Sequence, residues 1–173
     1  MKKPILVFAL AVLVCAIAYA STNTTKPSPA PTDAYAQLTK EEAKFVDLAN
    51  KERVSRGLSK LTVDPLLIKV ARAHSQEMAD KNYFSHDSPT PGMKTALDRY
   101  LAAIKTKPTW ALVGENLYYC SKVDCEGGHC ALMNSPHHRE NILEPKYQRI
   151  GLGAVITPKG EFYVTQMFLA QTD

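Results

Sequence analysis

"LTVDPLLIKVARAHSQEMADKNYFSHDSP", residues 61–89, is the stretch that decides the fold. Asp64 is a favourable N-cap residue, and Pro65 after it suits the first turn of a helix. Apolar residues then recur every three or four positions, which predicts a helix over 65–81. The residues on its inward face are Leu67, Val70, Ala71, His74 and Met78. A histidine on such a face is more often part of the core than a ligand, so His74 is left out of the candidate site.

Further helices and a terminal hairpin are predicted around this helix. Thr39 and Glu42 form a capping-box pattern, and the helix that they open is expected over 40–56. A third helix is expected over about 94–104. The β-rich runs "GLGAVIT" and "EFYVTQMF" flank residues 158–160 and predict an antiparallel hairpin. Helices first and a sheet last indicate an α+β layered domain.

The chain begins with an export signal. "MKKPILVFALAVLVCAIAYA", residues 1–20, carries two lysines, an apolar run and a small-residue cleavage pattern, so cleavage is expected after Ala20. Residues 21–38 are rich in Ser, Thr, Pro and Ala, which predicts a disordered linker before one folded domain over 39–173. We therefore expect a secreted protein, extracellular or in the cell envelope (the periplasm in a Gram-negative host). It should have no stable membrane span after cleavage.

The charge pattern argues against nucleic acid as a partner. The net charge is +4, and two of the lysines belong to the export signal. Basic and acidic residues are mixed along the rest of the chain, without the basic run that follows a phosphate backbone. We therefore expect no nucleic-acid binding.

"SPHHRENIL", residues 135–143, places two histidines side by side at the start of a predicted helix. Neighbours on a helix point about 100° apart, so the two rings cannot serve one site equally. His138 shares a face with Ile142, an apolar residue one turn on, and is expected to face inward. His137 shares its face with Asn141 and is expected to be an exposed bystander.

The motifs "ARAHSQEM", "YFSHDSP", "GENL" and "SPHHRENIL", in this order, resemble the CAP superfamily. This is the cysteine-rich secretory, plant pathogenesis-related and venom-allergen group, and the chain is most similar to its bacterial secreted branch, over about 42–168. The resemblance implies an α-β-α sandwich with a mainly antiparallel sheet. It also implies a central cleft with two histidines and two acidic residues.

Three of the four cleft residues of the family have counterparts here. His86 in "YFSHDSP", Glu115 in "GEN" and His138 match the two histidines and the first acid. The second acid is missing, because its position falls at about Ser135, and the tryptophan usual a few residues earlier is Leu132.

Two neutral imidazoles and a carboxylate form a three-ligand set for Zn²⁺ with an open fourth position, which lowers the pKa of a bound water. His86, His138 and Glu115 are thus candidate metal ligands and the only candidate catalytic residues. The alternative is a buried cluster that is simply hydrogen-bonded. Arg139 is expected to hold Glu115 or a backbone carbonyl, or to form a surface ion pair. Asn116 is expected to be structural.

Export places the protein in an oxidising compartment, and Cys15 is removed with the signal. Cys120, Cys125 and Cys130 then predict one disulfide and one spare thiol, with Cys120 to Cys130 preferred. Bacterial relatives usually have a short helix in this segment. Two consecutive glycines at 127–128 disfavour a helix, so a loop closed by the disulfide is expected. A small zinc site with a nearby histidine is the lesser alternative, since the spacing matches no common zinc motif.

The pattern leaves three functions open. The first is a secreted binding module whose cleft holds a divalent metal and a small apolar or protein ligand. The second is a metal-assisted hydrolase, peptidase-like, with zinc-bound water and Glu115 as ligand or base. The third is a structural envelope protein. The chain has neither a Gly-x-Ser-x-Gly nor a His-Glu-x-x-His motif, which favours the binding module.

Overall fold

The computed structural model describes residues 34–172. The predicted export signal and the linker residues 21–33 lie outside this range. The sequence predicts that residues 34–38 belong to the linker, but Ala34 is buried in the core and the Tyr35 hydroxyl donates to Asp47 at 2.8 Å. The folded part therefore includes residues 34–38, because Ala34 and Leu38 pack against the core.

The centre of the fold is one four-stranded sheet. Its strands are β1 (Thr62–Val63), β2 (Trp110–Cys120), β3 (Arg149–Ile156) and β4 (Phe162–Thr172). They lie in the order β1-β3-β4-β2, so β2 is an edge strand. The β2–β4 and β3–β4 pairs are antiparallel and the short β1 is parallel to β3, which gives the mainly antiparallel sheet that we expected.

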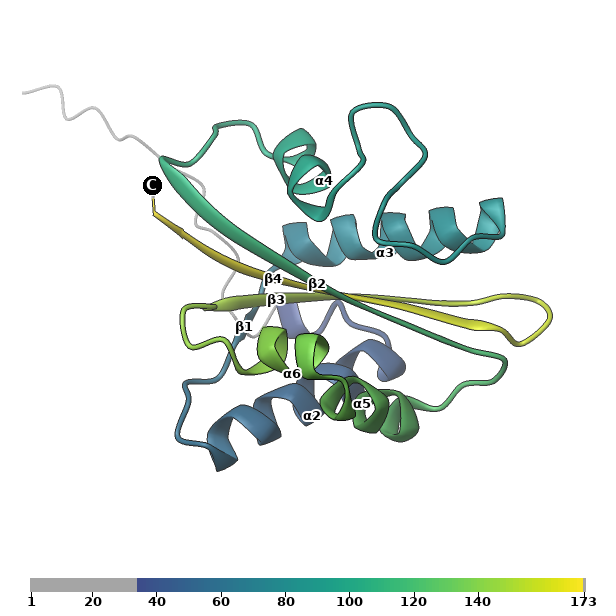
Figure 1. Cartoon of the computed structure of the whole chain (residues 1–173), viewed down its shortest axis with the longest axis horizontal. Coiled ribbons are helices and arrows are strands. Elements are labelled where there is room, and N and C mark those ends of the chain that lie inside the picture. Colours follow the sequence, from purple (N-terminus) through teal and green to yellow (C-terminus); the bar gives the residue numbers. More distant parts are fainter. Residues whose placement is uncertain (1–33, 173) are drawn as a thin grey trace, which may run out of the picture.

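Helices cover both faces of this sheet, as Figure 1 shows. They are α2 (Lys40–Ser55), α3 (Pro65–Lys81), α4 (Ala96–Ala103), α5 (Cys125–Asn134) and α6 (Pro136–Leu143). The helices α3 and α4 lie on one face, and α2, α5 and α6 lie on the other. The α-β-α sandwich is confirmed.

The predicted capping residues set the helix starts. Thr39 and Glu42 make both hydrogen bonds of a capping box at α2. The Asp64 side chain accepts from the backbone of the first turn of α3, whose bounds match the prediction. The helix α4 begins two residues later than expected, because Thr95 caps it with a capping box of its own.

Alternation along β4 divides the core between the two helical layers. Phe162, Val164 and Phe168 pack with the residues of α2, α5 and α6. Their neighbours Tyr163 and Met167 point to the other face, where α3 lies. Both faces of the strand are buried, so most residues of β4 are apolar, and Thr165 and Gln166 are buried polar exceptions.

Two glycines let α3 lie directly on β3. A Cβ atom added to Gly153 would lie 2.2 Å from the carbonyl carbon of Ala71, and one added to Gly151 would lie 2.3 Å from that of Leu67. Any larger residue would collide with the helix backbone. The sequence "IGLG", residues 150–153, therefore sets the distance between β3 and α3.

Arg53, in α2, is fully buried and fixes the position of α6. Its guanidinium donates to the carbonyls of Ser59, Ile142, Glu144 and Tyr147, at 2.9 to 3.3 Å. Three of these carbonyls belong to the end of α6 and the turn after it. A charge-assisted hydrogen-bond cluster of this kind locks the helix that carries His138.

The segment 120–130 differs from the prediction. Most of it belongs to α5, and Cys120, Cys125 and Cys130 are all free thiols, so the expected loop and disulfide are not formed. Tertiary packing outweighs the low helix propensity of glycine here, since a Cβ at Gly128 would lie 2.7 Å from the ring of Tyr118. Cys125 and Cys130 are five residues apart on the helix and so point in different directions.

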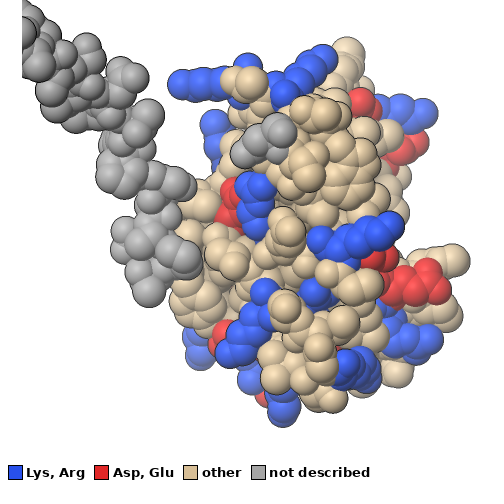
Figure 2. Space-filling model, turned by 90° about the vertical axis from the view of Figure 1, so that its left-hand side faces the viewer, with Lys and Arg blue, Asp and Glu red and all other residues tan. Residues whose placement is uncertain are grey.

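The surface seen in Figure 2 has Lys and Arg scattered among uncharged side chains. No helix within residues 34–172 is long and apolar enough to cross a membrane.

Candidate functional site

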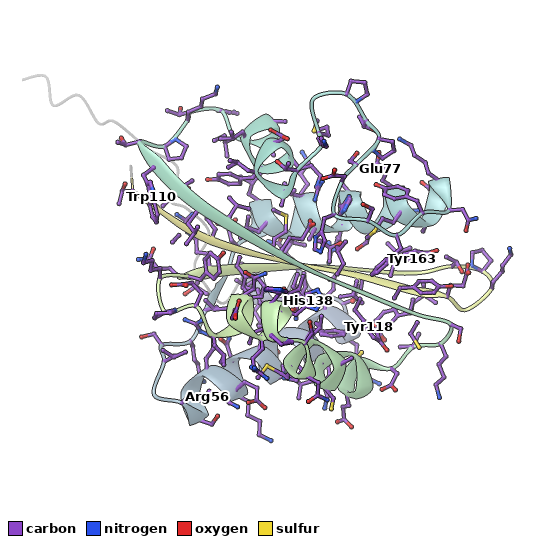
Figure 3. All side chains as sticks on the ribbon, viewed as in Figure 1. Arg56, Glu77, Trp110, Tyr118, His138 and Tyr163 are labelled. Atoms are coloured by element: carbon purple, nitrogen blue, oxygen red, sulfur yellow. The ribbon has the colours of Figure 1, made fainter. Side chains whose placement is uncertain are left out.

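The structure brings the three predicted site residues together at the free edge of β2. Glu115 lies in the middle of this strand, His86 lies in the loop between α3 and α4, and His138 lies in the first turn of α6. The two histidines therefore come from opposite layers and meet around the sheet edge, with their ring centroids 6.4 Å apart. Figure 3 labels His138 beside the sheet.

The Glu115 carboxylate is engaged at both oxygens. Its Oε1 lies 2.8 Å from Nδ1 of His86, and its Oε2 accepts from Nη2 of Arg99 at 2.5 Å. The carboxylate therefore holds the imidazole of His86 on one side and is paired with a cation on the other. Within residues 34–172, no group of three His, Cys, Asp or Glu residues is arranged to hold a metal ion. The three predicted residues thus lie together as two neighbouring imidazoles and a carboxylate that is hydrogen-bonded to one of them.

Arg99, in α4, is the site residue that sequence reasoning missed. Its Nη1 donates to the carbonyls of His86, Met93 and Lys94, so it holds the loop that carries His86 as well as Glu115. The sequence did contain an indication of this role. Arg99 is three residues after Ala96 and so lies on the apolar face of the predicted helix. An arginine on an apolar helix face needs a buried partner.

Arg139 does not hold Glu115. It donates instead to the carbonyl of Met133 at 3.2 Å, so the Glu115 alternative is wrong and the backbone-carbonyl alternative is correct. The helix α6 points Arg139 to the exposed surface, while α4 brings Arg99 over the buried face of β2.

Amide side chains tie α6 to β2. Asn116 donates to the carbonyl of His138 at 3.0 Å and to Oε1 of Gln166 at 3.2 Å. Asn141 donates to Oδ1 of Asn116 at 2.9 Å and to the carbonyl of Glu115 at 3.1 Å. The structural role predicted for Asn116 is confirmed, and the network fixes the backbone from which His138 extends.

The two adjacent histidines differ as expected. His138 is half-buried, and burial, followed by repulsion from His86 and His137, lowers its pKa. Its ring therefore stays neutral to a lower pH than that of a free histidine. The His137 side chain is 94% exposed and lies 3.5 Å from Glu140 on the next turn.

A second polar cluster anchors the loop that carries His86. Burial alone would raise the pKa of Glu77, but hydrogen bonds from Lys81, Thr90, Ser88 and Tyr83 together lower it by more. The pKa of Glu77 is therefore well below its ordinary value. The loop is thus attached to α3 through Glu77 and to α4 through Arg99.

His74 is part of the core, as predicted. It is 1% exposed, and its Nε2 lies 3.1 Å from the carbonyl of Ser85, beside His86 in sequence. Burial lowers its pKa.

The family described as "CAP: Cysteine-rich secretory protein family" matches residues 46–168. The chain belongs to this family. The protein YkwD of Bacillus subtilis is 39% identical over 150 residues, which cover 87% of this chain and 52% of YkwD. The CAP domain described here therefore spans about half the length of that relative.

Solved structures share the fold. An extracellular protein of Bacillus anthracis with an SCP domain superposes with a TM-score of 0.63 and 32% identity, over 84% of this chain and 45% of that one. NaASP2, solved with Zn²⁺, superposes with a TM-score of 0.54 and 14% identity, over 79% of this chain and 85% of its own.

Proposed function

We propose that this CAP domain is a binding module outside the cell, which binds a divalent metal ion such as Zn²⁺ between His86 and His138. The export signal predicted at residues 1–20 and the extracellular Bacillus anthracis relative support the location. Small apolar molecules or proteins are the ligands proposed for the domain as a whole.

The observation that carries the proposal is the hydrogen bond between Glu115 and Nδ1 of His86, at 2.8 Å. A carboxylate that accepts from one imidazole nitrogen fixes the tautomer and leaves the other nitrogen as a lone pair. In residues 34–172 Nε2 of His86 has no hydrogen-bond partner in the structure. His138 supplies a second neutral imidazole from α6.

Two imidazoles are fewer than the three protein ligands of a catalytic zinc site. A bound ion would hold water at its remaining positions and would be reversible. NaASP2 was solved with Zn²⁺, and its fold supports this choice of probe. The metal would connect α6 to the loop after α3, and so would rigidify the surface that a ligand meets.

The hydrolase alternative is less well supported by the geometry. Its general base would be Glu115, but both oxygens of this carboxylate are engaged by His86 and Arg99. A base must reach a water or a substrate proton directly. The contacts of this carboxylate with His86 and Arg99 compete with a role as general base.

Calorimetric titration with Zn²⁺ tests the proposal on protein purified without an affinity tag. We expect binding by the wild type, loss of binding in His138→Ala and in His86→Ala, and unchanged binding in the matched control His137→Ala. If the folded wild type binds no Zn²⁺ at neutral pH, the three residues are a hydrogen-bonded cluster, and a structural envelope protein becomes the better account. If only His137→Ala abolishes binding, the assignment of the two adjacent histidines is reversed.

A further inference from the structure

A groove of about 560 Å³ lies at one end of the central sheet. The residues that line it come from the start of β2, the end of β4 and the segments that lead into β1 and β3. All four strands therefore have an end at this groove. Because neighbouring strands lie about 4.8 Å apart, the three spacings from β1 to β2 amount to about 14 Å. A groove of this length can hold several units of a chain molecule.

Trp110 lines the groove where β2 begins, and its side chain is 47% exposed. Figure 3 labels it at this end of the sheet. A single exposed apolar side chain is common and needs no explanation by itself. The surroundings of this indole are unusual, because most of the other lining residues are polar; among them are Ser59, Thr62, Gln148 and Thr172. An aromatic face among hydrogen-bonding side chains suits a ligand that has both apolar C–H groups and hydroxyl groups.

The charge of the groove is positive. Lys60 and Lys146 line it and are exposed, and within residues 34–172 neither ammonium group takes part in an ion pair. None of the lining residues in this part of the chain is acidic. Figure 2 faces this end of the sheet, and the charged side chains seen there are mostly basic. A concave surface with cations of one sign attracts an anionic ligand.

We propose that this groove binds an acidic polysaccharide, a chain of sugar rings that carry carboxylate groups. The C–H face of one ring would stack on the indole of Trp110, whose π-face is partly negative. The ring hydroxyls would form hydrogen bonds with the hydroxyl and amide side chains of the groove. The carboxylates of neighbouring rings would pair with Lys60 and Lys146.

Other polyanions fit the groove less well. A single-stranded nucleic acid is bound by several aromatic platforms and a row of cations, whereas this groove offers one exposed indole and two lysines. A membrane surface is bound by an apolar face that enters the lipid, whereas Trp110 is surrounded by polar side chains.

The groove is separate from the metal site of the proposed function. Trp110 and Glu115 are five residues apart on β2, which corresponds to about 17 Å along the strand. None of His86, Glu115 and His138 lines the groove. The inference therefore adds a ligand class to the domain and stands even if Zn²⁺ does not bind.

The fluorescence of Trp110 reports on this groove alone, because the chain has one tryptophan. Tetragalacturonate is a suitable probe, and its fully methyl-esterified form is the uncharged control. We expect the acid to change the emission of the exported protein in a saturable manner, with an affinity that falls as salt is added. The ester should bind about fivefold more weakly, because it forms neither ion pair. Equal affinities for acid and ester would overturn the proposed recognition, as would an unchanged emission with the acid.

Lys60→Gln with Lys146→Gln removes both cations, and Lys159→Gln is the matched control, an exposed lysine in the hairpin at the opposite end of the sheet. We expect the double variant to bind tetragalacturonate about fivefold more weakly and the control to bind it as the wild type does. Unchanged affinity in the folded double variant would place the ligand elsewhere and contradict the proposal.

Trp110→Ala should weaken the binding of tetragalacturonate about tenfold in calorimetry, because the stacking surface is lost. Tyr119→Ala is the matched control, since this aromatic side chain is 41% exposed at the other end of β2 and should not affect the affinity. Vesicles that contain phosphatidylglycerol and an oligothymidylate test the two other polyanions. A change of the Trp110 emission with either of them, and none with tetragalacturonate, would assign the groove to a membrane or a nucleic acid and overturn the inference.

Discussion

Arg99 and Glu115 form an ion pair of 2.5 Å whose side chains are only 5% and 4% exposed. The pair joins α4 to the edge strand β2. Glu115 in turn holds the ring of His86, and Arg99 holds the carbonyl of the same residue. The position of His86 in an exposed loop is thus decided by a buried pair.

Arg99→Met should lower the free energy of unfolding by about 3 kcal/mol, because it leaves the buried Glu115 carboxylate without its cation. Urea denaturation of the exported protein measures this. Arg139→Met removes an arginine of the exposed surface and should cost less than about 1 kcal/mol. Equal losses in the two variants would mean that the buried pair adds nothing to stability.

The affinity for Zn²⁺ should fall as the pH is lowered through about 6.5, because both imidazoles must be neutral to bind the ion. The pKa of His138 is lowered by burial, so its contribution to the loss occurs at a lower pH than that of a free histidine. Calorimetric titrations at several pH values between about 7.5 and 5 follow this change. An affinity independent of pH over this range would exclude histidine ligands.

His129→Leu should raise stability by about 1 kcal/mol at neutral pH, because neither ring nitrogen of the buried His129 has a hydrogen-bond partner within residues 34–172. The variant should also resist acid better. Burial lowers the pKa of His129, so the unfolded chain binds the proton more readily, and the wild type loses stability as the pH falls below about 6.5.

Urea denaturation at neutral and acidic pH gives both quantities. The matched control is His137→Leu, whose side chain is exposed and whose replacement should change neither the stability nor its pH dependence appreciably. A steeper loss in acid for His129→Leu than for the wild type would contradict the assignment.

Gly153→Ala should destabilise the protein by at least about 3 kcal/mol, because its Cβ would lie within 2.2 Å of the backbone of α3 and the helix would have to move. Gly57→Ala tests a different effect, since φ is +75° there and the space around it is open. It should cost only about 1 kcal/mol of backbone strain. Thermal unfolding ranks the two variants, and an equal shift would show that α3 does not depend on the glycine.

Much of the fold follows from local sequence. Asp64 and Pro65 start α3 at the predicted residue, and the capping box of Thr39 starts α2, because caps act within one turn of chain. The hairpin between β3 and β4 turns at residues 158–160, where Gly160 has φ of +85°. The inward direction of His138 also followed from the helix period alone.

Local sequence determined the helices α2 and α3 and the hairpin, and the family resemblance predicted that His86, Glu115 and His138 share one cleft. Only the tertiary structure decided that Glu115 is an ion-paired support for His86, because its partner Arg99 lies on a different element. It likewise decided that Gly127 and Gly128 belong to a helix, since the close packing of α5 against Tyr118 outweighs the local preference. Local rules act over one turn or one strand pair, whereas these contacts depend on how the layers meet.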